Sequence, residues 1–193
     1  MKSKFPKSWA PLPVPVRHEH MIVKAAMMAS LLLNAIGEVE SPSGVPVAGD
    51  GGRALSLYQI HRATWQDVYD RYGAKPGFNG VDVGQRFEDI GGADFDSLVR
   101  ARNTGSIHIG IIEEFLQKHH QPTSARKIYA CWNLGCEGFR KRCFTLKNCP
   151  LITQTNARKV AERAKVKAEP EKRRGAEGAE AGSRQQTQSR TIN

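Results

Sequence analysis

The feature that most constrains the fold is an apolar helical stripe that stops at a proline. Between Met21 and Glu40 apolar side chains recur at helical spacing, and Leu32 and Ile36 are typical of them. Pro42 disfavours helical geometry at the residue before it, so we expect this helix to end at Glu40. A stripe of this length has to be buried against other elements, which favours a mainly α-helical domain.

The remaining pattern predicts one folded domain between two extensions. Four prolines in residues 1–20 predict an extended arm, and residues 151–193 are polar and basic, so we expect a largely disordered tail. Residues 21–150 hold the other helical patterns, at 62–72, 107–120 and 125–134, and Ser124 and Gly135 are typical caps for the last of them. A loop or short hairpin is expected at 42–59, and an irregular connection at 73–97.

The formal net charge of +10 is distributed unevenly. Residues 1–24 hold five basic and one acidic residue, and residues 150–193 hold ten and five. Residues 25–149 are nearly neutral, with fourteen basic and thirteen acidic residues. The charge therefore indicates solvated basic ends, and such ends also attract anionic polymers, including bacterial cell walls and nucleic acids.

The chain's location in the cell has two readings. No run of about 20 apolar residues is present, so no membrane span is expected. Residues 21–35 have the order of features of a signal peptide, with a basic residue, an apolar stretch and a small residue, yet they also form the predicted core helix.

Four cysteines fall within residues 131–149 at spacings that match no zinc site. We expect local disulfides if the chain is exported, and buried thiols in a reducing compartment.

Glu40 stands out as a candidate proton donor. It borders the apolar stripe and ends the helix, where desolvation and the partial negative charge of the helix terminus both oppose ionisation. We therefore expect its pKa to be raised, as the cleavage of a glycosidic bond requires of its general acid. The alternative is an exposed glutamate at a helix end.

His61 has no partners at metal-binding spacing, and we interpret it as a surface or hydrogen-bonding residue.

Three segments of sequence carry a family resemblance: "EVES" at 38–41, "GDGGRALSLYQIHRATWQDV" at 49–68 and "YACWNLGCEGFRK" at 129–141. Together they resemble the lysozyme-like superfamily, closest to the invertebrate-type lysozymes and also similar to the soluble lytic transglycosylases. The resemblance covers residues 30–142 approximately. It implies an α+β lysozyme-like fold, mainly helical, with a short loop or hairpin after the catalytic helix.

The resemblance also implies roles for single residues. Glu40 matches the catalytic acid and Asp50 the second carboxylate. The residues matched to the substrate-binding positions are Ser41, Tyr58, Gln59, Ile60, Trp132 and Asn133. Each has an alternative role, since an aspartate between glycines forms turns, aromatic residues fill cores, and amide side chains satisfy buried backbone groups.

The function expected from these residues is glycoside hydrolysis of the amino-sugar backbone of peptidoglycan. If Asp50 is not catalytic, the resemblance favours a lytic transglycosylase, and a non-catalytic cell-wall or polyanion-binding protein is the other alternative. Neither catalytic route implies a cofactor or a metal, and the family implies secretion or the cell envelope. We expect an activity centred on Glu40 to survive removal of residues 151–193.

Overall fold

The computed structural model describes residues 16–73 and 82–165, and this part of the chain is mainly α-helical. The helices are α1 (Val16–Glu40), α2 (Arg62–Val68), α3 (Phe95–Lys118), α4 (Ala125–Leu134) and α5 (Cys136–Arg140), and residues 151–165 are also helical. Strands β1 (Ala54–Leu55) and β2 (Ile60–His61) form an antiparallel hairpin, with Ala54 opposite His61. Short helical turns lie at Asp50–Gly52, Tyr69–Gly73, Phe87–Ile90 and Leu146–Asn148.

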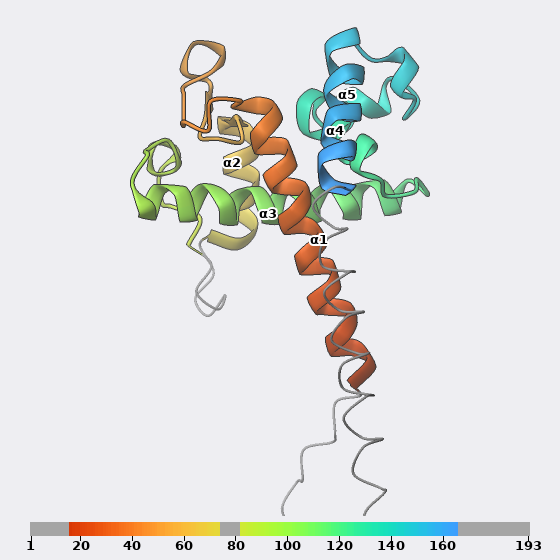
Figure 1. The fold of residues 1–193 in the computed structure, drawn as a ribbon, viewed down its shortest axis with the longest axis horizontal. Helices are drawn as coiled ribbons and strands as arrows, with labels where there is room; N and C mark the ends of the chain where they lie inside the picture. The colour runs from red at the N-terminus through yellow and green to blue at the C-terminus, as the bar shows by residue number, and fades with distance from the viewer. Residues whose placement is uncertain (1–15, 74–81, 166–193) are drawn as a thin grey trace, which may run out of the picture.

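Helix α3 lies across α1, and the other elements stand on either side of α1 (Figure 1). The hairpin and α2 are on one side, and α4, α5 and residues 151–165 are on the other. The crossing is close at Gly105, because a Cβ atom there would lie 2.7 Å from Cδ1 of Leu33. The C-terminal end of α1, which carries Glu40, is therefore positioned between two groups of elements.

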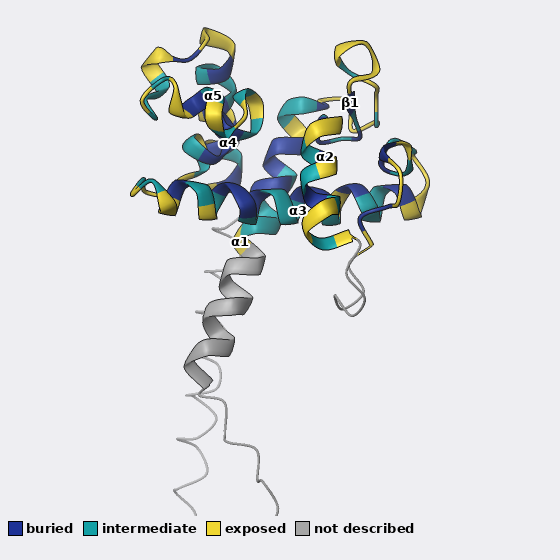
Figure 2. Ribbon diagram, turned by 180° about the vertical axis from the view of Figure 1, so that it is seen from behind, coloured by how far each residue is buried: buried dark blue, intermediate teal, exposed yellow. Residues whose placement is uncertain are grey.

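The buried residues gather where the helices meet, whereas the loops and outer turns are exposed (Figure 2). Large side chains from most helices share one core, among them Leu33, Ile36, Ile109, Ile112, Leu116, Tyr129, Phe139 and Val160. The apolar stripe predicted for α1 is thus buried as expected, since Leu33 and Ile36 are fully enclosed.

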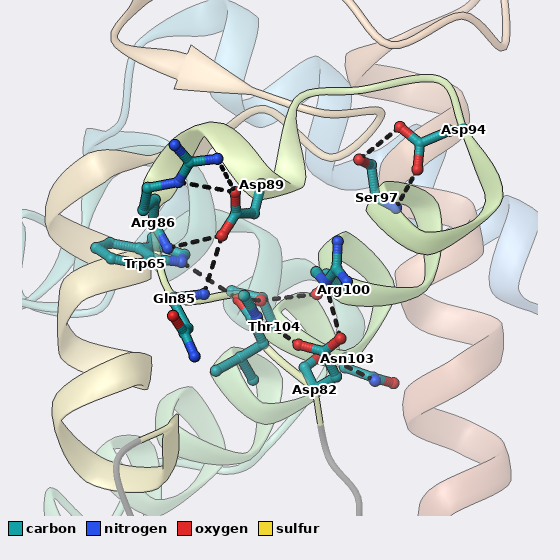
Figure 3. A network of polar contacts seen from close by, with 12 residues as sticks. Trp65, Asp82, Gln85, Arg86, Asp89, Asp94, Ser97, Arg100, Asn103 and Thr104 are labelled. Atoms are coloured by element: carbon teal, nitrogen blue, oxygen red, sulfur yellow. Dashed lines mark hydrogen bonds and ion pairs between the residues drawn. The ribbon is translucent and has the colours of Figure 1, made fainter.

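Helix α3 begins twelve residues earlier than the predicted start at Ile107. Its first half buries small residues such as Ala101 and Thr104, which give no strong apolar period. The side chain of Asp94 caps the helix by accepting a hydrogen bond from the backbone N–H of Ser97 at 3.0 Å. Figure 3 shows this cap beside a polar network in which Arg100 donates to Asp82 at 2.7 Å.

The predicted tail was wrong for its first part. Residues 151–165 form a helix, and Thr153, Ala157, Val160, Ala161 and Ala164 are buried on one of its faces. These small residues recur at three- and four-residue spacing among charged ones, so the prediction from charge missed them. The predicted arm was likewise wrong at residues 16–20, which belong to α1. Residues 1–15, 74–81 and 166–193 lie outside the described residues.

Helix α4 follows its predicted bounds, and the hydroxyl of Ser124 accepts from the backbone N–H of Lys127 at 3.4 Å. All four cysteines, each within the described residues, are free thiols, so the disulfides expected for an exported chain are not formed. Among the described helices, none combines the length and the apolar character that crossing a membrane requires.

Candidate active site

A cavity of about 130 Å³ lies at the C-terminal end of α1. Its lining residues come from α1, the hairpin region and α4, and they are Glu40, Asp50, Ala54, Gln59, His61, Trp132 and Asn133. Five of them were predicted from sequence as site residues, although they come from three separate segments. The cavity therefore gathers both candidate carboxylates with three of the six candidate substrate-binding residues.

Glu40 is the last residue of α1, as predicted, and its carboxyl group is half-buried. The hydroxyl of Tyr129 donates a hydrogen bond to its Oε1 at 2.7 Å. Burial raises the pKa of Glu40, because enclosure removes water from the charged form, and the negative charge of Asp50 raises it further. The Tyr129 hydrogen bond and the nearby His61 act in the opposite direction, but the net direction is upward.

Tyr129 links Glu40 to the helix at residues 151–165. Its side chain is fully buried, and its hydroxyl accepts a hydrogen bond from Nδ2 of Asn156 at 3.2 Å. Burial, followed by the charge of Glu40, raises the pKa of Tyr129, so the phenol stays protonated and remains a donor. Sequence reasoning missed this role, although Tyr129 lies four residues before Asn133 on the same face of α4.

Asn133 is held by the same helix. The hydroxyl of Thr153 donates to Oδ1 of Asn133 at 2.7 Å, and Thr153 itself is buried. With the Tyr129–Asn156 bond, this gives two contacts between the α4 part of the site and residues 151–165. The helix assigned by sequence to a disordered tail therefore supports the site.

Asp50 approaches the cavity from a turn. Its side chain is 57% exposed, and its Oδ2 lies 3.3 Å from Nε2 of His61. The sequence predicted His61 as a surface or hydrogen-bonding residue, and this exposed contact agrees with that prediction. The backbone at Asp50 has φ 51°, a left-handed conformation that aspartate tolerates better than most residues. The pair of Asp50 and His61 thus lines the cavity from its solvent-exposed side.

Gln59 holds the loop that carries Asp50. Its Nε2 donates to the backbone oxygens of Val47, at 2.8 Å, and Ser56, at 3.0 Å. Gly49 makes room for this side chain, since a Cβ atom there would overlap Oε1 of Gln59. Because two bonds occupy both protons of the amide nitrogen, Gln59 satisfies backbone groups, the alternative that the sequence left open.

Trp132 is half-buried between the cavity and the protein interior. Its Nε1 donates to the backbone oxygen of Tyr58 at 3.1 Å, and its ring centroid lies 5.1 Å from that of His108. These contacts fix the orientation of the indole where it lines the cavity. A flat apolar surface at this place suits the face of a sugar ring.

The other three candidate binding residues do not line this cavity. Ile60 and Tyr58 are 1% and 7% exposed and belong to the core, where the Tyr58 ring packs on Gly37. Ser41 is buried, and its Oγ has no hydrogen-bond partner in the described part of the chain. Direct contact of Ile60 with a substrate in this cavity is therefore a wrong prediction, because its side chain is enclosed by the core.

Comparison of the chain with family models, with curated proteins and with solved structures finds no match. Within residues 16–73 and 82–165, no group of three or more His, Cys, Asp or Glu side chains is arranged to hold a metal ion.

Proposed function

We propose that this protein is a lysozyme-like glycosidase that cleaves the amino-sugar backbone of peptidoglycan, with Glu40 as general acid and base. The observation that carries the proposal is the Glu40 carboxyl group, half-buried at a cavity and with a raised pKa. A carboxyl group with a raised pKa keeps its proton to a higher pH than an ordinary glutamate, so it can protonate the oxygen that leaves a glycosidic bond. Such a substrate places the protein's action in the cell envelope or outside the cell.

The hydrogen bond from Tyr129 gives the acid a direction. Because Oε1 of Glu40 accepts from Tyr129, a neutral carboxyl group carries its proton on Oε2. Protonation of the glycosidic oxygen breaks its bond to the sugar and leaves Glu40 as a carboxylate. That carboxylate then takes a proton from the water molecule that completes hydrolysis, which restores the acid.

Asp50 supplies the second carboxylate. An ionised Asp50 on the same cavity stabilises positive charge that develops on the sugar ring in an oxocarbenium-like transition state. Trp132 offers an apolar face to the sugar, and Asn133 adds polar contacts at the edge of the cavity. These residues together support the proposal of a two-carboxylate glycosidase.

A lytic transglycosylase is the second candidate, and the exposure of Asp50 favours it. An aspartate that is 57% exposed and beside His61 is less constrained than a nucleophile held by buried groups. In that route Glu40 alone carries the proton, and the substrate's own N-acetyl group or hydroxyl completes the reaction. The product then is an anhydro sugar.

Digestion of purified murein tests both routes. We expect Glu40→Gln to lower the release of soluble fragments about a hundredfold or more, since it removes the transferable proton. Glu113→Gln is a matched control, because Glu113 is also half-buried with a pKa raised by burial and lies away from this cavity. Full digestion by Glu40→Gln would contradict the proposal, and binding of murein without digestion by the wild type would indicate a wall-binding protein.

The products separate hydrolysis from transglycosylation. If Asp50 takes part, Asp50→Asn loses most of the activity, and wild-type fragments carry reducing ends. If Glu40 acts alone, Asp50→Asn retains most of the activity, and the fragments carry anhydro ends. Mass spectrometry of the released fragments distinguishes the two ends by the mass of one water molecule.

A further inference from the structure

A second and wider cavity, of about 630 Å³, lies between α2, α3 and the start of α5. Part of its lining is apolar, with Ile111 and Phe115 from α3 and Leu134 from the end of α4. Its volume is several times that of the Glu40 cavity. The mechanism proposed above makes no use of it.

The two cavities adjoin each other along the chain and through one pair of rings. Trp132 lines the Glu40 cavity and His108 lines the wider one, and their ring centroids are 5.1 Å apart. Asn133 lines the Glu40 cavity, and the next residue, Leu134, lines the wider one. Likewise, His61 lines the Glu40 cavity and Ala63 lines the wider one. The rings of Trp132 and His108 therefore lie between the two cavities, which are neighbours on the molecule.

Charges of both signs surround the wider cavity. Glu114 and Lys118, one turn apart on α3, are exposed and form no ion pair within the described residues. The other charged side chains are already paired, since Arg71 binds Asp67 at 3.0 Å and Glu137 accepts from Arg140 at 2.6 Å. Among the described residues that line it, the cavity thus offers one cation and one carboxylate without an ion-pair partner, which complements a ligand that carries both an anionic and a cationic group.

His108 adds an unsatisfied polar group to the wall. Its Nδ1 is enclosed and has no hydrogen-bond partner among the described residues, and the residue lines the cavity. Burial lowers the pKa of His108 to about 4, so the ring is neutral at pH 7. Because no acceptor from residues 16–73 or 82–165 lies at Nδ1, the neutral ring is best protonated at Nε2, which can donate to a carbonyl group in the cavity.

We propose that the wider cavity binds the short peptide that branches from the glycan strand of peptidoglycan, an inference that rests on the proposed function. Such a peptide carries carboxylates and, on its diamino acid, an ammonium group, together with amide carbonyls. These groups match Lys118, Glu114 and His108 in turn. An uncharged sugar has no use for the two charges, and a polyanion would meet an excess of acidic side chains around the cavity.

Kinetics on two forms of the same glycan test the inference. Strands with intact peptides are compared with strands from which an amidase has removed the peptides. The measured quantity is the KM for the stripped strands divided by the KM for the peptide-bearing strands. We expect the wild type to have the lower KM for the peptide-bearing form. Lys118→Ala is expected to reduce this ratio about fivefold, the worth of one exposed charge pair. Lys159→Ala, an exposed lysine outside the cavity, should leave the ratio unchanged.

An NMR titration with a free tetrapeptide (alanine, glutamate, diaminopimelate, alanine) needs no catalysis. We expect resonances of His108 to shift with peptide, and the shift to be lost in Ala63→Phe, which fills the cavity from an exposed position of α2. Binding of the peptide to a protein that digests no murein would contradict the proposed function but support this site. Equal KM values for the two strands, or peptide shifts that persist in Ala63→Phe, would overturn the inference.

Discussion

The two walls of the Glu40 cavity are built in different ways. The helical wall holds Glu40 and Asn133 through hydrogen bonds from the buried Tyr129 and Thr153. The loop wall holds Asp50 on an exposed turn, next to an exposed His61. The difference indicates that helix packing fixes the proposed acid, whereas the second carboxylate depends on a surface loop.

Backbone strain is concentrated on the loop wall. Asp50, Ser56 and Gln59 all have positive φ, at 51°, 72° and 50°, within ten residues of chain. Conformations of this kind cost about 1 kcal/mol or more each and persist where the surroundings enforce them, often near functional sites. The amide of Gln59 is one such restraint, because it bonds to two backbone oxygens of the same loop. We infer that this loop is held in one shape at the expense of local stability.

The largest effect is expected from removing the support of the helical wall. A chain that ends at residue 150 loses Thr153 and Asn156 and exposes the core against which Val160 packs. We expect a loss of several kcal/mol in the free energy of unfolding and no detectable digestion of murein. Thermal unfolding followed by circular dichroism, together with the digestion assay, measures both.

A chain that ends at residue 165 is the control, since it keeps every described residue of this helix. It should retain the thermal midpoint and the activity of the full chain. The sequence alone predicted that activity survives removal of residues 151–193, and the buried face of residues 151–165 reverses that expectation. Wild-type activity in the shorter chain would show that the helical wall needs no such support.

An intermediate effect is expected from Tyr129→Phe. The hydroxyl lowers the pKa of Glu40 by donating to it, so its removal should raise that pKa further and move the alkaline limb of kcat/KM to higher pH. Loss of orientation should reduce kcat about tenfold. The free energy of unfolding should fall by about 1 kcal/mol, because Asn156 loses its acceptor.

Tyr69→Phe removes a hydroxyl that makes no hydrogen bond within the described residues. It should leave the pH profile, kcat and the free energy of unfolding unchanged. The pH profile separates the proposed role from a purely structural one, because a packing defect would lower activity at every pH equally. An unchanged alkaline limb in Tyr129→Phe would mean that Tyr129 does not act on Glu40.

The local features of the fold were predictable from the sequence. Ser124 and Gly135 bound α4 as expected, and Pro42 follows the end of α1, because caps and prolines act on their immediate neighbours. The mainly helical class is confirmed as well, since it depends on apolar periodicity. The start of α3 was missed, because Ala101 and Gly105 pack through their small size rather than their apolar character.

The partners of the site residues were not predictable in the same way. Tyr129 bonds to Glu40 across 89 positions of sequence, and Asn156 reaches Tyr129 from a segment that reads as a charged tail. Such contacts depend on how the helices pack, which no local pattern encodes. The raised pKa of Glu40 was predicted in direction from its desolvation and its helix-end position, and burial is its largest cause in the structure.

The smallest effect concerns the stability of the helical wall itself. The pKa of Glu40 is raised above its ordinary value of 4.5, so the neutral carboxyl favours the folded state. The contribution of the neutral Glu40 carboxyl to the free energy of unfolding is complete below pH 4.5, and it is lost as the pH rises through the pKa of Glu40 in the folded state. Glutamine is neutral throughout, so Glu40→Gln should be more stable than the wild type at pH 8 by about 0.5–1 kcal/mol, and not at pH 4.

Thermal unfolding of both proteins at the two pH values measures this difference, with the exposed Glu162→Gln as the baseline for losing one carboxylate. Oε1 of a glutamine at position 40 can still accept from Tyr129, so the comparison isolates the cost of enclosing a charge. If the two proteins had equal free energies of unfolding at pH 8, water would reach the carboxylate freely. The same would follow if the advantage of Glu40→Gln over the wild type grew as the pH fell. The helical wall would then hold its carboxyl group no more tightly than the loop wall holds Asp50.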